Sequence, residues 1–277
     1  MGTIVNTNVN SIATQHALVQ SQRTLDKAME QLSTGQRINS AADDATGLAI
    51  GNKLGTQILS LNQAVRNAND GISMLQTADG ASGQMVTMLQ RMRELAIQSA
   101  NDTNDQDARD AMQQEFAGLQ TEINNSITNT SWNGMQLLDL GAGSAKNIYF
   151  HVGPGSEDNI ALPLASFDSG DVKTALTTAS INTRPHAITS LNLIDQAITQ
   201  IDTERGKWGA MMNRLTYAAD NASNVSLNTN ASRSRIMDAD YALATAELAR
   251  AMILNNAGSA MLSQANQQPI YVLALLS

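Results

Sequence analysis

One long apolar seam between residues 43 and 100 constrains this chain more than any other feature. Apolar side chains recur there at alternating spacings of four and three residues: Leu54, Ile58, Leu61, Val65, Ala68, Ile72 and Leu75. This spacing is typical of a helix that packs along its length against other helices. After Leu75 the stripe takes an extra three-residue step, which overwinds a coiled coil without ending it, and continues through Ala78, Ser82, Met85, Leu89, Met92 and Ala96. Such a helix extends on the order of 80 Å, too long for a compact globule.

The segment 6–32 is also predicted to be a helix, and it carries two separate apolar stripes. One stripe advances by four and three residues through Val5, Val9, Ile12, His16 and Val19, and the other recurs every seven residues at Leu18, Leu25 and Leu32. A helix with such stripes needs a partner helix to bury them. Gly35 is a plausible end for this helix, and the run from Ser40 to Asp44 has N-cap chemistry for the next one.

Three further helices are expected, each with its own stripe. The first spans 105–129 with Met112, Phe116, Leu119, Ile123 and Ile127, and the second spans 184–227 with Ile188, Leu191, Ile194, Ile198, Ile201, Met212, Leu215, Ala219 and Ala222. The last spans 238–266 with Leu243, Leu254, Ala257 and Met261, and Pro269 is expected to end it.

Between these helices, residues 135–183 change in character. Gly and Pro become frequent, and short alternating runs such as 147–152 and 159–162 predict strands joined by turns. The fold class expected is mainly α: a long antiparallel, coiled-coil-like helical rod with a small β-hairpin and turn module in the middle. Its parts are a terminal helix and spoke at 1–42, rod halves at 43–134 and 184–233, the β module at 135–183, and a terminal helix at 234–277. The simplest packing reverses the chain at the β module, which brings both terminal helices together.

Composition excludes several classes of function. The 277 residues include no cysteine, so disulfides and thiolate metal sites are impossible. The net charge of −8 disfavours a nucleic-acid partner, which calls for a basic stripe. No apolar run is long enough to span a membrane, and the start of the chain does not resemble a secretory signal, so no membrane insertion is expected.

No constellation of side chains indicates catalysis, a cofactor or a metal. The three histidines, His16, His151 and His186, are far apart and lack neighbours at ligand spacing. Asp238 and Asp240 could bind a divalent ion, but an N-cap pair at the start of the last helix explains them better. The Met residues at seam positions, among them Met85, Met92, Met112 and Met261, are expected to fill the core or a contact between subunits.

Several long motifs, in order, resemble the bacterial flagellin family. They are residues 8–13 (NVNSIA), 32–50 (LSTGQRINSAADDATGLAI), 89–103 (LQRMRELAIQSANDT), 234–242 (SRIMDADYA), 264–269 (QANQQP) and 272–276 (VLALL). The resemblance covers about 1–140 and 183–277. The chain departs from many flagellins in its short middle region and in Tyr271 near the end.

The resemblance implies a non-enzymatic, extracellular structural protein that is exported unfolded and polymerises into the flagellar filament for swimming. In the family the terminal segments form an inner coiled-coil tube only on assembly. The residues here that would form it are Val5, Val9, Ile12, Leu18, Leu25, Leu254, Met261 and Leu275. Implied partners are other copies of the chain, an export chaperone, the cap and the hook–filament junction proteins. The family motif for subunit packing and for the animal Toll-like receptor that recognises flagellin matches Arg91, Leu95 and Glu115.

Two alternatives remain open at this point. One is a hook–filament junction protein, a flagellin relative with similar ends. The intact block around Arg91 and the motif at 238–241 argue against it. The other is a surface adhesin built on the same helical core, with the middle segment as its binding face.

Overall fold

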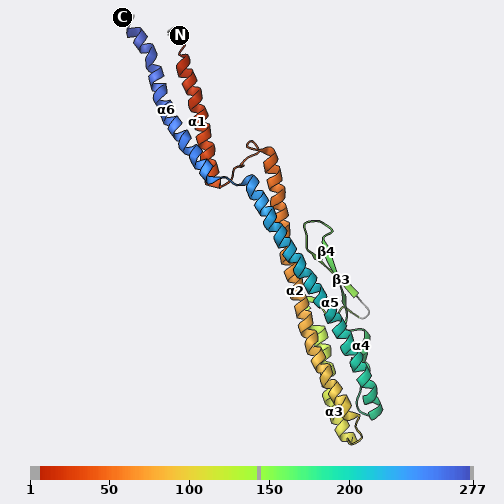
Figure 1. Cartoon of the computed structure of the whole chain (residues 1–277). Helices are drawn as coiled ribbons and strands as arrows, with labels where there is room; N and C mark the ends of the chain where they lie inside the picture. The colour runs from red at the N-terminus through yellow and green to blue at the C-terminus, as the bar shows by residue number, and fades with distance from the viewer. Residues whose placement is uncertain (1–6, 142–144, 275–277) are drawn as a thin grey trace. The chain divides into compact units, whose positions relative to one another are not determined.

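Helices dominate the structure, a computed structural model that describes residues 7–141 and 145–274 (Figure 1). In these ranges the elements are α1 (Val9–Thr34), α2 (Ala45–Ser99), α3 (Gln106–Asn129), β1 (Ser131–Trp132), β2 (Met135–Gln136), β3 (Ala145–His151), β4 (Asn159–Ala165), α4 (Gly170–Thr178), α5 (Arg184–Met237) and α6 (Tyr241–Ala274). The chain divides into two compact units. Leu59–Ser226 is called the central unit here, and Met1–Ile58 with Leu227–Ser277 the terminal unit. The mainly α fold expected from the sequence is confirmed.

The central unit has the core that the seam of α2 predicts. On both sides of the extra three-residue step the seam positions are buried, including Leu61, Ala68, Leu75, Ala78, Ser82, Met85, Leu89, Met92 and Ala96. The stripe of α3 is buried as expected at Met112, Phe116, Ile123 and Ile127, and that of α5 at Ile194, Ile201, Leu215 and Ala222. Ile188 is an exception, with 47% of its surface exposed, because Ala187 and Ser190 occupy the inner face of the first turns of α5.

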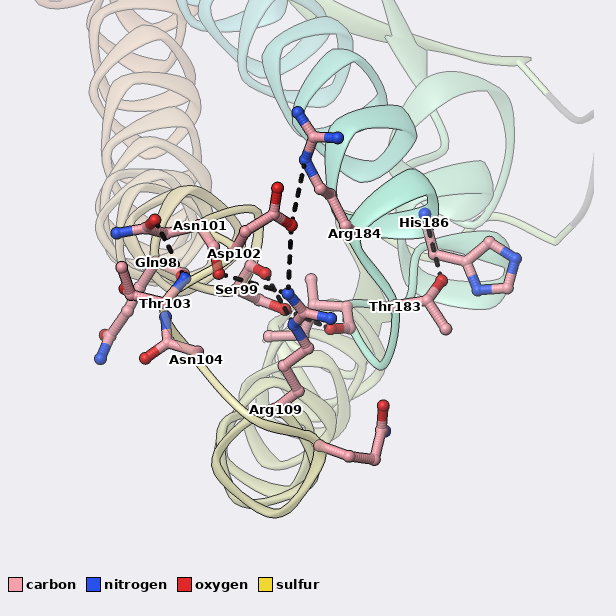
Figure 2. Close-up of polar contacts among 12 residues, drawn as sticks. Gln98, Ser99, Asn101, Asp102, Thr103, Asn104, Arg109, Thr183, Arg184 and His186 are labelled. Carbon is pink, nitrogen blue, oxygen red and sulfur yellow. Dashed lines mark hydrogen bonds and ion pairs between the residues drawn. The ribbon is translucent and has the colours of Figure 1, made fainter.

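The expected place of chain reversal is wrong. Residues 100–105 and 179–183 reverse the chain at one end of the central unit, where the Ser99 hydroxyl donates to the Ile181 carbonyl. Figure 2 shows the Arg109 guanidinium at this end, donating to the carbonyls of Ser99 (3.1 Å) and Asn101 (3.2 Å). These bonds satisfy carbonyls that the end of α2 leaves without helical partners.

The β3–β4 hairpin instead lies alongside the helices of the central unit. The Asn67 side chain donates to the His151 carbonyl (2.9 Å), and a methyl group at Gly71 would lie 2.8 Å from the Phe150 ring. The hairpin therefore packs along α2, and glycine at position 71 permits the close approach.

The middle region contains more structure than the sequence analysis anticipated. The strands are confirmed as two antiparallel hairpins, β1–β2 and β3–β4, but the first begins before residue 135. Asn133 and Gly134 form its two-residue turn, both with positive φ (49° and 78°). Helix α4 was not predicted. Its Val172 N–H donates to the Gln200 side chain of α5 (3.0 Å), so its cap comes from a distant part of the chain.

In the terminal unit the helix boundaries differ from those expected. Helix α5 continues ten residues beyond Leu227, because Met237 is buried in close contact with Gly51 of α2. Asp240 caps α6 by accepting from the N–H groups of Ala242 (2.9 Å) and Leu243 (3.3 Å), as an N-cap should. The expectation that Pro269 ends the last helix is wrong. Proline removes one N–H from the helical ladder, yet the helical backbone continues to Ala274.

The end of α1 and the following loop are held by one carboxylate. Gly35 ends the helix with a positive φ of 69°, as predicted. Asp43 accepts from the N–H of Ser40 (3.1 Å) and forms an ion pair with Lys27 of α1 (2.9 Å). These interactions, the bond from Lys27 foremost, lower the pKa of Asp43 from 3.8 to about 2.

Acid should therefore loosen this loop. Because the pKa of Asp43 is lower in the folded than in the unfolded chain, its carboxylate stabilises the fold above pH 3.8, and this contribution is lost as the pH falls towards 2. The protection factor of the Ser40 amide, its exchange rate relative to an unprotected amide at the same pH, should fall across that range, and Asp43→Asn should show low protection at neutral pH as well. If protection in the native chain does not change between pH 5 and pH 2, the carboxylate does not hold the loop.

Candidate assembly surface

Helices α1 and α6 lie side by side in the terminal unit, as expected (Figure 1). The face of α1 towards α6 carries the seven-residue stripe. Leu18 and Leu25 are partly buried there, next to the buried Ser11, Ser21 and Ala28. The other stripe, with Val9, Ile12 and Val19, lies on the opposite side of the helix and is exposed. Helix α1 thus buries only one of its two apolar stripes within the chain.

Small residues on α6 face α1. Ala244, Ala251 and Ala265 are buried at seven-residue intervals, and Gly258 completes the series, where a methyl group would lie 3.3 Å from Leu18 Cδ1. Leu243, Leu254 and Met261, which belong to the stripe expected for this helix, do not face α1, and all three are exposed. Small side chains let two helices approach closely, so the larger residues are displaced to the flank of the contact.

Polar side chains supply much of the contact between α1 and α6. Asn8 donates to the Ala265 carbonyl and Ser11 to the Asn266 side chain, both at 2.7 Å. Asn255 donates to the Gln22 side chain (2.7 Å). Each such bond contributes a net ~1 kcal/mol at most, much less than the burial of a large apolar side chain. The pair is thus specific in its contacts but buries little apolar surface.

The predicted assembly residues therefore fall in different places. Leu18 and Leu25 contact α6, whereas Val9, Ile12, Leu254 and Met261 lie on exposed faces. Val5 and Leu275 are outside the described residues, and for Tyr271 only the helical backbone is described. The sequence analysis missed the exposed Met29, Met252 and Ile253, and it missed the small residues of α6. A search for small residues recurring every seven positions would have found the latter.

The residues of the second predicted site are only partly brought together. The Arg91 guanidinium bridges Glu115 of α3 and Glu94 of its own helix, each at 2.9 Å, and these carboxylates raise the pKa of Arg91, Glu115 most. Arg91 and Glu115 are exposed, whereas Leu95 is 2% exposed and belongs to the core. The surface thus presents an ion pair across α2 and α3, whereas Leu95, about one turn further along α2, lies in the core.

The central unit carries other ion pairs between its helices. Arg93 of α2 binds Asp195 of α5 (2.7 Å), and Asp102 lies between Arg109 (3.7 Å) and Arg184 (3.5 Å), as Figure 2 shows. Exposed pairs of this kind contribute little to stability. They bring opposite charges on neighbouring elements together at the surface.

His16, His151 and His186 lie on α1, β3 and α5, and no three His, Asp or Glu side chains in residues 7–141 and 145–274 gather as metal ligands would. None of the helices described there is long and apolar enough to cross a membrane.

Comparison with known proteins gives consistent matches. The model of the bacterial flagellin N-terminal helical region matches residues 5–142, and that of the C-terminal helical region matches residues 191–276. A flagellin of Halalkalibacterium halodurans is 41% identical over 273 residues, 99% of each chain. Flagellin E of Vibrio cholerae is 32% identical over an alignment of 378 positions that covers both chains completely. Since this chain has 277 residues, that relative contains residues missing here, in keeping with a reduced middle region.

Solved structures agree with this relationship. The crystal structure of Bacillus cereus flagellin matches with a TM-score of 0.51 and 33% identity, over 57% of this chain and 88% of that one. A flagellar hook-associated protein of Vibrio parahaemolyticus has a TM-score of 0.61 over 71% of this chain, but at 17% identity it shows a shared fold only. The two family models, the full-length identity to curated flagellins and the fold together show that this chain belongs to the bacterial flagellin family.

Proposed function

We propose that the exposed apolar faces of α1 and α6 are the contacts through which copies of this chain polymerise. As a flagellin, the chain is a structural subunit of the extracellular flagellar filament, a homopolymer that serves motility. The observation that carries the proposal is the outer stripe of α1. Val9, Ile12 and Val19 are exposed at helical spacing and have no partner on α6. Contiguous apolar surface of this kind usually marks a protein contact.

The exposed residues of α6 extend this surface. Leu243, Leu254 and Met261 lie on one flank of the helix, because 7 and 18 residues correspond to about two and five helical turns. In a polymer, neighbouring copies would cover this flank and the outer stripe of α1. The alternatives, a hook–filament junction protein and an adhesin, are not favoured by the family matches.

The hydrophobic core supports a separation between assembly and folding. Every residue of the main core cluster lies between Ala68 and Ala219, within the central unit. We therefore propose that the terminal segments at 1–42 and 234–277 serve assembly. The rod halves at 43–134 and 184–233 would fold by themselves. The module at 135–183 would then pack against the outside of these helices.

Seeded elongation tests the proposal. Full-length chain added to sheared fragments of its own filaments should extend them, as seen by negative-stain electron microscopy. A variant without residues 1–34 and 241–277 should remain helical and melt cooperatively, because it keeps the whole core cluster, yet it should not elongate seeds. Failure of the full-length chain to elongate would contradict the filament proposal. An unfolded truncated variant would contradict the proposal that the terminal segments assemble while the rest of the chain folds by itself.

The same arrangement supports the other partners that we propose. Because α1 and α6 bury little apolar surface against each other, the ordering entropy of these segments is poorly offset outside the polymer. This supports export in an unfolded state, with an export chaperone covering the apolar faces, and addition of subunits next to the cap and the hook–filament junction proteins. For the Toll-like receptor, the surface pair of Arg91 and Glu115 would provide the contact and Leu95 would support α2 from the core.

A further inference from the structure

The methionines of this chain fall into groups that differ sharply in exposure. The sequence contains thirteen. Within the described ranges, six are buried (Met74, Met85, Met92, Met112, Met211 and Met237) and three are partly buried (Met88, Met135 and Met212). Only Met29, Met252 and Met261 in these ranges are exposed, by 54%, 51% and 62%. All three belong to α1 or α6, so the exposed thioethers of the described residues are confined to the helices that carry the assembly faces.

The positions of these three thioethers determine how their oxidation would affect contacts between subunits. Met261 lies on the flank shared with Leu243 and Leu254, which the proposed contacts cover. Met252 precedes Met261 by about two and a half helical turns, so it lies on the opposite side of α6, beside the exposed Ile253. Oxidation of a thioether to a sulfoxide replaces an apolar group by a strong hydrogen-bond acceptor. Burial of that acceptor without a donor is costly, so a sulfoxide opposes every contact that excludes water from this surface.

Because the chain contains no cysteine, methionine provides the only sulfur atoms that peroxide can oxidise. Thiolates are ordinarily the most reactive sulfur groups in a protein, and this chain has none. Hydrogen peroxide transfers one oxygen atom to the methionine sulfur. The O–O bond breaks, an S–O bond forms, the sulfur is oxidised, and the peroxide is reduced to water. Among the methionines, reactivity then follows access of peroxide to sulfur.

We infer that Met29, Met252 and Met261 are peroxide-sensitive modification sites, and that their oxidation, above all at Met261 on the proposed contact flank, switches the unassembled chain from competence to incompetence for assembly. The inference rests on the proposed polymerisation through α1 and α6. In the polymer the Met261 sulfur is covered and protected, so its oxidation selects unassembled chains. Reversal needs a thiol-dependent sulfoxide reductase from outside, which returns the thioether and releases water as two thiols form a disulfide, since the chain supplies no thiol of its own.

The first experiment maps oxidation without any need for assembly. Full-length monomer is treated with hydrogen peroxide, and sulfoxide formation is followed by peptide mass spectrometry. Met29, Met252 and Met261 should oxidise roughly tenfold faster than Met74, Met85 and Met92, because access of the oxidant sets the rate. Equal rates for the two groups would overturn the inference whatever the chain does on seeds.

The second experiment measures elongation of untreated seeds. Monomer oxidised at the three exposed positions should elongate at least roughly tenfold more slowly than untreated monomer, because its contact surface is now polar. In a variant with Met29→Leu, Met252→Leu and Met261→Leu, the elongation rate should not change on peroxide treatment, whatever that rate is before treatment. The matched control carries Met74→Leu, Met85→Leu and Met92→Leu, which conserve side-chain volume, and it should remain as sensitive as the native chain.

Each result has a definite meaning. Normal elongation by fully oxidised native monomer, or full sensitivity of the variant that lacks the exposed methionines, would overturn the inference while the filament proposal stands. Failure of untreated monomer to elongate would instead overturn the filament proposal itself. Treatment of oxidised monomer with methionine sulfoxide reductase and a thiol should restore elongation, and no recovery despite complete reduction would contradict reversibility.

Discussion

Replacement of Ile12 by aspartate should abolish seeded elongation and leave the melting of the central unit unchanged. Ile12 lies in the exposed outer stripe of α1 between Val9 and Val19, so a carboxylate there would have to be buried when the next subunit covers the stripe. Burial of an unpaired charge costs several kcal/mol, enough to prevent a contact that must form repeatedly along a filament. The substitution does not touch the central unit, whose core contains no residue of α1.

Matched variants separate charge from position in this experiment. Ile12→Leu keeps an apolar side chain of the same volume and should elongate normally. Thr24→Asp adds the same charge to an exposed position of α1 that does not border the stripe, and it should have a much weaker effect. Growth rates are measured by electron microscopy of timed samples, and melting by circular dichroism. Normal elongation by Ile12→Asp would show that the outer stripe is not a contact between subunits.

Replacement of Leu95 by alanine should destabilise the central unit by about 2–5 kcal/mol, since truncation of a buried leucine removes its burial and leaves a cavity. Leu95 is 2% exposed and lies in the main core cluster. For a unit of this size the loss corresponds to a fall in melting temperature on the order of 10 °C. Arg91→Ala should leave melting nearly unchanged, because its ion pairs with Glu94 and Glu115 are exposed.

This contrast matters for the interpretation of receptor or assembly measurements at these positions. Loss of function in an Arg91 or Glu115 variant would report on surface recognition, whereas loss in a Leu95 variant would combine recognition with a weakened fold. Leu95→Met, which conserves volume, serves as the control for packing. Unchanged melting of Leu95→Ala would contradict the burial of this side chain.

Helical periodicity predicted the central unit well and the terminal unit only partly. The face of α2 that is buried carries the seam from Leu61 to Ala96, including the extra step after Leu75. The seam predicts this face because a helix buries its apolar side whichever element packs against it. Periodicity does not say which of two apolar stripes meets which partner. The apolar residues of the two helices therefore did not reveal that small residues such as Ala251 and Gly258 of α6 form the contact with α1.

The other differences also depend on distant parts of the chain. Helix α4 has few apolar positions, and its first turn is capped by Gln200, which follows it by more than twenty residues. The last ten residues of α5 are mostly polar and become recognisable as helix only through the contact of Met237 with Gly51. Reversal at residues 100–105 depends on bonds from Arg109 to carbonyls at the end of α2. None of these partners can be identified from local pattern alone.

The hydrogen bonds between polar side chains of α1 and α6 determine the register of the two helices, which the apolar residues alone leave open. Leucines recur every seven residues on α1, and Ala244, Ala251, Gly258 and Ala265 recur every seven on α6, so a shift of one helix by seven residues would present nearly the same packing. Such a shift would place Gln22 opposite Leu248 or Leu262 instead of Asn255 and would leave its amide without a partner. A single alignment of the two helices means that every copy of the chain displays the same outer surface, and a regular lattice of subunits depends on that uniformity.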